Sequence, residues 1–82
     1  MITLYTKEYC PYCTKAKNLL DSLWATYEEV DVTHDIDTLI SIAKKSGLRT
    51  VPQIFRDDIC LGGYDSLEAL HMKWELVEKL GI

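Results

Sequence analysis

Two cysteines, Cys10 and Cys13, stand at the point where a strand pattern gives way to a helix pattern. Residues 2–6 alternate apolar and polar side chains, as a strand with one better-buried face does. From Pro11 onward, apolar residues recur at positions 16, 19, 20 and 23, which is the spacing of one helix face. A C-x-x-C pair at a strand-to-helix junction of a small α/β chain indicates a thiol–disulfide redox site.

The proline between the cysteines indicates where the helix begins. Pro11 suits the first helical position because its φ is fixed and its N–H is missing, so we expect Cys10 at the N-cap. Backbone N–H groups and the helix dipole then favour a thiolate, and we expect the pKa of Cys10 to lie below that of a free cysteine. Lys7 adds a nearby positive charge. We predict that Cys10 is the nucleophile and Cys13, within disulfide range one turn later, the resolving thiol.

The pair could instead be structural or form half of a zinc site. Zinc ribbons and fingers need a second ligand pair at a set spacing. The other candidate ligands are Cys60, His34 and His71, and none of them is paired at such a spacing. A structural pair would leave the position of Pro11 at the junction without a purpose. We therefore expect no bound metal and no tightly bound cofactor.

The length and charge of the chain exclude several classes of protein. Eighty-two residues fit one domain over residues 1–82, and a net charge of −4 with dispersed Lys and Arg gives nucleic-acid binding no electrostatic support. The sequence has neither a secretion signal nor an apolar run that would span a membrane. These features predict a cytoplasmic protein, where cysteines are more often catalytic than structural, and three cysteines do not suit a disulfide scaffold.

The remainder of the chain alternates between strand and helix patterns. Residues 27–32 read as a second strand, which makes the first two strands parallel through a βαβ unit. Thr33 or Asp35 can cap a second helix that ends at Gly47. The apolar side of that helix carries Ile36, Leu39, Ile40 and Ala43.

The last third predicts a hairpin and a final helix. Residues 53–56 and 59–61 are short strands on either side of a turn at Asp57-Asp58. Asp65 or Ser66 then starts the last helix. We expect its core side to carry Leu67, Leu70, Trp74 and Val77, and Trp24 also to lie in or beside the core. The order βαβ-α-ββ-α predicts an α/β fold with a four-stranded mixed sheet and helices on both faces.

Three motifs in this order resemble the dithiol glutaredoxins: Cys10-Pro11-Tyr12-Cys13, Thr50-Val51-Pro52, and Gly62-Gly63-Tyr64-Asp65. The resemblance covers essentially the whole chain in element order as well as in motifs. It implies a thioredoxin-like fold, with the four-stranded mixed sheet flanked by three helices, and a single glutaredoxin domain over residues 1–82. It also implies that Pro52 is a cis-proline.

The resemblance further implies a glutathione site. The backbone of Val51 would bind the cysteinyl part, and the start of the last helix would receive the γ-glutamyl end, with Asp65 pairing with its amino group. Asp65 is equally explained as a simple helix cap. Lys7 and Arg49 are the candidates for the glycine carboxylate, while Leu39 stands where many members of the family have Gln or Arg. The implied glutathione-binding residues are Lys7, Tyr12, Arg49, Thr50, Val51, Pro52, Gly63, Tyr64, Asp65 and Ser66.

The activity implied is glutathione-dependent thiol–disulfide exchange, with glutathione as co-substrate. The expected partners are proteins that contain disulfides or carry bound glutathione, and ribonucleotide reductase is typical of the family. We expect a monomer that contacts neither nucleic acid nor a membrane. Two alternatives stay open: a thioredoxin-like electron donor served by a reductase, and a carrier of a glutathione-bridged iron–sulfur cluster. Cys60 reads as a small core residue.

Overall fold

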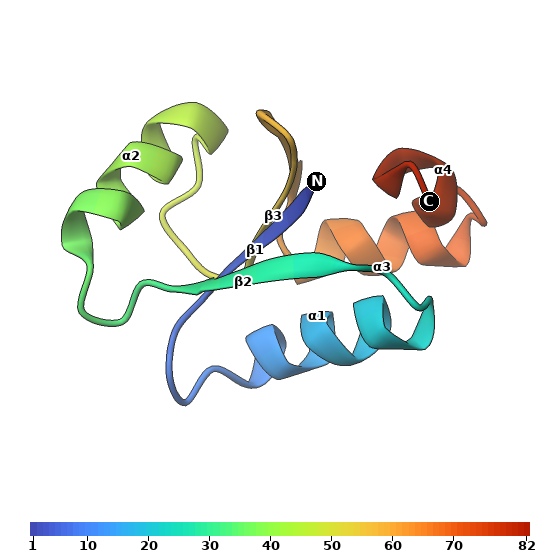
Figure 1. Ribbon diagram of the computed structural model, residues 1–82, viewed down its shortest axis with the longest axis horizontal. Helices are drawn as coiled ribbons and strands as arrows, with labels where there is room; N and C mark the ends of the chain where they lie inside the picture. The colour runs from blue at the N-terminus through green and yellow to red at the C-terminus, as the bar shows by residue number, and fades with distance from the viewer.

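A four-stranded mixed sheet forms the centre of the structure, a computed structural model that describes residues 1–82 (Figure 1). Its strands are β1 (Ile2–Thr6), β2 (Tyr27–Asp31), β3 (Gln53–Arg56) and β4 (Ile59–Gly62), in the order β2-β1-β3-β4. β1 runs parallel to β2, and β3 runs antiparallel to β1 and β4. The predicted parallel start and the predicted hairpin are both confirmed.

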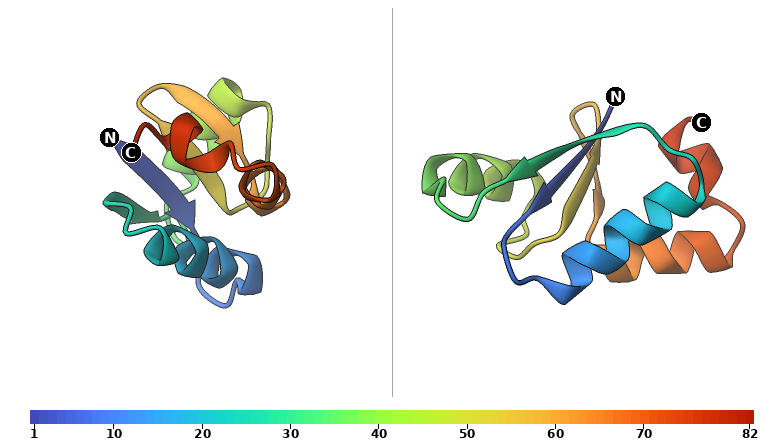
Figure 2. Two further views of the ribbon diagram at one scale, coloured as in Figure 1. Left: turned by 90° about the vertical axis from the view of Figure 1, so that its right-hand side faces the viewer. Right: turned by 60° about the horizontal axis from the view of Figure 1, so that its bottom comes forward.

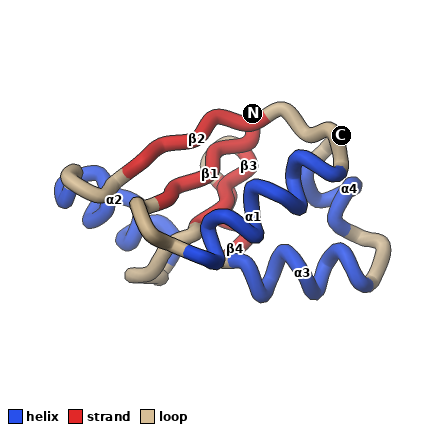
Figure 3. The backbone as a smooth tube through the Cα atoms, turned by 90° about the horizontal axis from the view of Figure 1, so that it is seen from below, coloured by secondary structure: helices blue, strands red, loops and turns tan.

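Helices cover both faces of this sheet. They are α1 (Pro11–Ser22), α2 (Ile36–Ser46), α3 (Tyr64–Met72) and α4 (Leu76–Leu80). α1 and α3 lie side by side on one face, whereas α2 lies on the other (Figures 1 and 2). Seen from below, α1 and α3 run alongside each other away from the loops at their N-terminal ends (Figure 3). Their first residues therefore lie at the same end of the molecule.

The larger core fills the space between the sheet and the helices α1, α3 and α4. Alternate residues of β1 face it, because successive side chains of a strand point to opposite faces. Its fully packed members are Ile2, Leu4, Ala16, Leu20, Ile54, Leu67, Leu76 and Leu80. On the other face of the sheet, Phe55 is buried and its ring meets that of Tyr5 edge to face at 5.5 Å.

The two tryptophans lie outside the core, contrary to the prediction. Trp24 and Trp74 follow the ends of α1 and α3 with φ of 57° and 61°, and each side chain is 93% exposed. After α3, the N–H of Trp74 donates to the carbonyl of His71, and the next N–H reaches back to Leu70. This is a Schellman turn, which ends a helix with one left-handed residue and turns that residue outward.

The same turn divides the predicted last helix into α3 and α4. After the break the register changes, so that Leu76 and Leu80 are buried while Val77 is 45% exposed. The prediction that Trp74 and Val77 face the core was therefore wrong, because it extended one helical period through the break.

The rest of the protein also leaves most of the apolar side of α2 uncovered. Ile42 is its only buried residue, whereas Ile36 is 63% exposed and Ile40 is 47% exposed. The ends of the helix follow the sequence signals. The Asp35 carboxylate accepts the N–H of Thr38 at 3.1 Å, and Gly47 ends the helix with a φ of 77°.

Candidate redox site

Cys10 and Cys13 form a disulfide at the N-terminus of α1, with their Cα atoms 5.2 Å apart. Pro11 is the first helical residue and Cys10 the N-cap, as predicted. The sulfur of Cys10 accepts the N–H of Cys13 at 3.1 Å. Cys13 is 2% exposed, whereas Cys10 is half-buried. A reaction partner from solvent therefore reaches Cys10 first.

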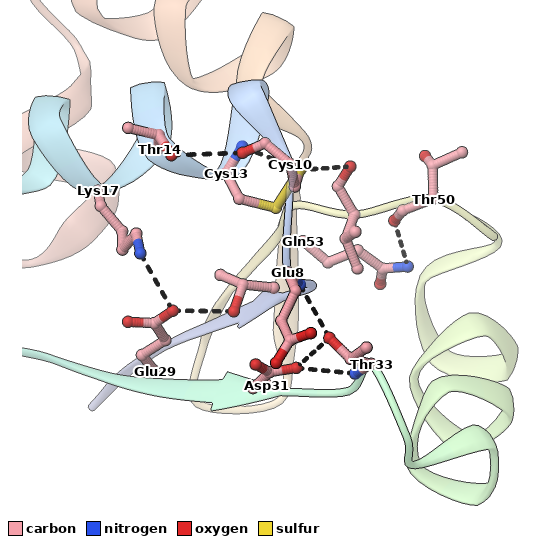
Figure 4. The surroundings of a disulfide bond; sticks show 12 residues. Glu8, Cys10, Cys13, Thr14, Lys17, Glu29, Asp31, Thr33, Thr50 and Gln53 are labelled. Atoms are coloured by element: carbon pink, nitrogen blue, oxygen red, sulfur yellow. Dashed lines mark hydrogen bonds and ion pairs between the residues drawn. A yellow bond between two sulfur atoms is a disulfide. The ribbon is translucent and has the colours of Figure 1, made fainter.

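The loop that carries Cys10 is fastened to the end of β2. The N–H of Glu8 donates to the hydroxyl of Thr33 at 2.8 Å, and Thr33 in turn donates to the carboxylate of Asp31 (Figure 4). These hydrogen bonds from Thr33 hold the pKa of Asp31 below its usual value. The turn before the cysteines is thus positioned by contacts far away in the sequence.

A polar hollow of about 460 Å³ lies on one side of the disulfide. Lys7 lines it together with both cysteines. At its base, the hydroxyl of Thr6 donates to Glu29 at 2.9 Å, and the ammonium of Lys17 lies 3.3 Å from the same carboxylate. The sequence analysis missed this chain of polar groups. Its one signal was Thr6 itself, a polar residue on the buried face of β1.

On the other side, the cis peptide bond between Val51 and Pro52 faces the redox pair. The resemblance implied this cis bond, and the structure confirms it. The carbonyl oxygen of Val51 lies 3.9 Å from the sulfur of Cys10. Pro52 is buried, so the Val51 backbone is held against the sheet beside the disulfide.

Gln53 holds the segment that leads into this cis bond. Its side chain is fully buried, and its amide nitrogen donates to the carbonyls of Leu48 at 2.9 Å and Thr50 at 3.0 Å. Its amide oxygen has no partner. Sequence reasoning assigned Gln53 only to a strand, although a buried amide next to Pro52 is the kind of polar residue that orders a loop.

A second cleft, of about 480 Å³, runs from this segment to the start of α3. Every residue predicted to bind glutathione lines it, except Lys7 and Arg49. Its lining residues are Tyr12, Leu48, Thr50, Val51, Pro52, Gly63, Tyr64, Asp65 and Ser66. Lys7 lies in the polar hollow beside the cysteines, and Arg49 lies in a third hollow along α2. The structure therefore does not gather the predicted set into one cleft.

The start of α3 differs from the prediction. Gly63 is the N-cap, with extended backbone and no side-chain capping bond, so neither Asp65 nor Ser66 is the cap. The preceding Gly62 has a φ of 105°, and a Cβ there would lie 2.5 Å from the hydroxyl oxygen of Ser66. A side chain at Gly62 would therefore collide with Ser66, and the absence of one lets the first turn of α3, with its free N–H groups, lie at the end of the cleft.

Two tyrosines and a lysine form the rim of the cleft. The ring centroids of Tyr12 and Tyr64 lie 6.0 Å apart. The ammonium of Lys15 lies 5.0 Å from the centroid of the Tyr12 ring and 5.9 Å from that of the Tyr64 ring. A hydrogen bond to Glu68 is the main cause that raises the pKa of Tyr64. The sequence analysis did not place Lys15 at the site, although it follows Tyr12 by three residues, which puts both on one helix face.

The third cysteine lies apart from this pair. Cys60 is a half-buried free thiol in β4, and its sulfur accepts the N–H of Gly62 at 3.3 Å. No group of three or more His, Cys, Asp or Glu side chains is arranged to hold a metal. None of the helices has the length and apolar character needed to cross a bilayer.

Comparison with known proteins points to one family. The sequence model described as Glutaredoxin matches residues 2–60. A glutaredoxin of Ricinus communis is 39% identical over an alignment 82 residues long. That alignment covers 96% of this chain and 80% of the relative. Glutaredoxin 3 of Escherichia coli (strain K12) is 44% identical over 69 residues, covering 84% of this chain and 83% of the relative. A crystal structure of the buckwheat glutaredoxin–glutathione complex superposes with a TM-score of 0.89 at 31% identity, covering 98% of this chain and 76% of that one.

Proposed function

This chain belongs to the glutaredoxin family, and from that premise we propose that it uses glutathione to reduce protein disulfides and protein–glutathione mixed disulfides. Membership makes it a thiol–disulfide oxidoreductase whose active-site pair is Cys10 and Cys13. The observation that carries the proposal is the position of Cys10, the more exposed member of this pair. Cys10 lies beside a cleft that ends in the free N–H groups of a helix.

The reaction begins with the Cys10 thiolate. It attacks one sulfur of a protein disulfide, forms a mixed disulfide, and releases the other sulfur as a thiolate. Cys13 then attacks the Cys10 sulfur. This step forms the Cys10–Cys13 disulfide, and the Cys13 proton passes to the protein thiolate that leaves. The protein disulfide has gained two electrons, and the enzyme has lost them.

Glutathione returns the enzyme to the dithiol state in two exchanges. One glutathione thiolate attacks the Cys10 sulfur and releases Cys13, which leaves Cys10 glutathionylated. A second glutathione thiolate attacks the sulfur of the bound glutathione, which releases the Cys10 thiolate and glutathione disulfide. A glutathionylated protein enters the cycle at the same intermediate, because Cys10 attacks its glutathione sulfur directly.

We place glutathione in the cleft beside the cis bond. The backbone of Val51 meets its cysteinyl part, and the first turn of α3 receives its γ-glutamyl carboxylate. Asp65, exposed and free of any capping role, is positioned to pair with the ammonium group. Lys7 lines the polar hollow on the other side of the disulfide together with Cys10, and we assign it to the glycine carboxylate. The buckwheat relative was crystallised with glutathione, which supports this ligand.

One assay tests the proposal. The reduced protein is given a glutathionylated peptide, and turnover with glutathione is compared with turnover by NADPH and thioredoxin reductase. We expect turnover with glutathione only. Turnover with the reductase alone would favour the thioredoxin-like alternative. A visible absorbance band after anaerobic purification, without exchange activity, would favour the iron–sulfur carrier. The proposed setting is a cytoplasmic monomer acting on disulfide-containing proteins, of which ribonucleotide reductase is one candidate.

A further inference from the structure

The apolar side of α2 forms a groove that the protein itself leaves uncovered. This α2 groove is a hollow of about 480 Å³ lined by four apolar residues and two cations: Ile36, Leu39, Ile40, Ala43, Lys44 and Arg49. Ile36 is 63% exposed and Ile40 is 47% exposed, while Leu39 and Ala43 are half-buried. A volume of this size falls within the range of about 300–1,000 Å³ that is typical of ligand sites.

The charge at the edge of the groove has a single sign. Lys44 and Arg49 line it, and no carboxylate does. Neither cation forms an ion pair, whereas the adjacent Lys45 lies 3.9 Å from Asp58. Lys44 and Arg49 therefore make this edge positive, although the protein as a whole carries a net charge of −4. A bound partner that combines apolar side chains with carboxylates would satisfy both the groove and its edge.

The groove is continuous with the redox site through one short segment. Gly47 and Arg49 line the groove, while Leu48 lines the cleft beside the disulfide. The buried amide of Gln53 fixes this segment, and Val51, two residues after Arg49, reaches the Cys10 sulfur. A substrate polypeptide that is joined to Cys10 and runs along residues 47–51 therefore passes directly from the cleft onto α2.

We propose that the α2 groove binds the protein substrate: it receives apolar side chains, flanked by Asp or Glu, that lie near the reacting cysteine of that substrate. The inference deepens the proposed function and rests on it. The groove then selects among protein disulfides, while the cleft beside Val51 serves glutathione. Arg49 belongs to the recognition of protein substrates, in place of the glycine-carboxylate contact expected from the sequence.

Synthetic peptides of about 12 residues test this proposal. Each carries one cysteine activated as a mixed disulfide with 2-nitro-5-thiobenzoate, so that attack by Cys10 joins the peptide to Cys10 and releases the coloured thiolate. The first peptide has Leu and Phe flanked by Asp and Glu on both sides of the cysteine. In the second peptide Ser replaces Leu and Phe, and in the third Lys replaces the acids. We expect the first peptide to react about tenfold faster than either control under subsaturating conditions.

Two substitutions in the groove are compared with two matched controls outside it. Ile40→Ser and Lys44→Glu should each remove most of the preference for the first peptide. Ile59→Ser replaces an equally apolar, 67% exposed residue of β4, and Lys45→Glu reverses the adjacent charge, so both should keep the preference. Circular dichroism and thermal unfolding confirm that all four variants are folded. Turnover of a small glutathione mixed disulfide should be unchanged in all four.

Three results would overturn the proposal. The first is an equal rate for all three peptides. The second is a loss of activity towards the small glutathione mixed disulfide in Ile40→Ser, which would make the groove part of the glutathione site. The third is a wild-type dimer in sedimentation that Ile40→Ser dissociates, which would make the occupant a second copy of this chain. The peptide reaction contains no glutathione, so failure of the glutathione proposal would appear separately, in steady-state turnover.

Discussion

The sulfur of Cys10 lies 3.9 Å from the carbonyl oxygen of Val51, a residue 41 positions later in the chain. The sulfur belongs to the N-cap residue of α1, and the carbonyl oxygen belongs to the cis peptide bond that directly precedes β3. Neither element is a redox site alone. Together they place the reactive sulfur beside the backbone that we propose binds the cysteinyl part of glutathione.

The two cysteines should have separable roles. We expect Cys10→Ser to abolish all exchange activity, because only Cys10 is both capped by an N–H and open to solvent. Cys13→Ser should keep reduction of glutathione mixed disulfides and lose reduction of protein disulfides, since that step needs the resolving thiol. Steady-state assays on the two substrate types measure this. Faster alkylation of Cys13 than of Cys10 at neutral pH would reverse the assignment.

Asp65→Ala should weaken glutathione binding without changing the reactivity of the sulfur. The carboxylate is exposed, so its contact with the ligand ammonium contributes on the order of 1 kcal/mol, or a several-fold higher Michaelis constant for glutathione. The effect should shrink in high salt. Alkylation of Cys10 by a small uncharged reagent should keep its rate and pH profile.

Asp37→Ala is the matched control for that prediction, because Asp37 also lies in the first turn of a helix but outside the cleft. It should leave the Michaelis constant for glutathione unchanged. Since Gly63 and not Asp65 caps α3, Asp65→Ala should also keep the helix content seen by circular dichroism. Unchanged glutathione kinetics in Asp65→Ala at low salt would remove Asp65 from the proposed site.

Gln53→Met should lower both stability and glutathione affinity. The substitution keeps the volume similar but leaves the part-buried hydrogen bonds to the carbonyls of Leu48 and Thr50 without their donor, and two such bonds contribute about 1–3 kcal/mol together. The free energy of unfolding in urea should fall by that amount. The Michaelis constant for glutathione should rise several-fold because the segment before Val51 is no longer fixed. A drop in stability with unchanged glutathione kinetics would show that the amide supports only the fold.

Asp35→Asn should remove a pH-dependent part of the stability. The carboxylate accepts hydrogen bonds from the hydroxyl and the N–H of Thr38, and the hydroxyl bond is the main cause that holds the pKa of Asp35 below its ordinary value of 3.8. A lowered pKa gives stability that is fully present above the ordinary value and is lost as the pH falls through the folded-state value. Wild type should therefore be more stable than the variant at pH 6, and the difference should vanish near pH 2. Urea unfolding across this range measures it, and a constant difference would contradict the assignment.

The sequence alone determined the local features of this protein. Pro11, the two cysteines and the helical spacing after them defined the redox pair and its cap. Gly47 defined the end of α2, and Thr33 and Asp35 were the two candidates for its start, of which Asp35 is the cap. These signals were readable because capping, proline stereochemistry and strand alternation act between residues a few positions apart. The strand pattern likewise predicted the elements of the sheet, each within a residue of its observed end.

Only the tertiary structure decided which apolar surfaces are covered and which polar groups meet. Trp74 and Ile40 fit the period of a core face, yet they are exposed. A Schellman turn changes the register after α3, and Ile42 is the only residue of α2 that the rest of the fold buries. The hydrogen bond between Thr6 and Glu29 joins two strands that are 23 residues apart in sequence. Gln53 bonds to the nearby Leu48, but only the folded sheet buries its amide. Whether a residue is buried depends on which other segments of the chain pack against it. The apolar period within one helix or strand does not indicate which segments those are.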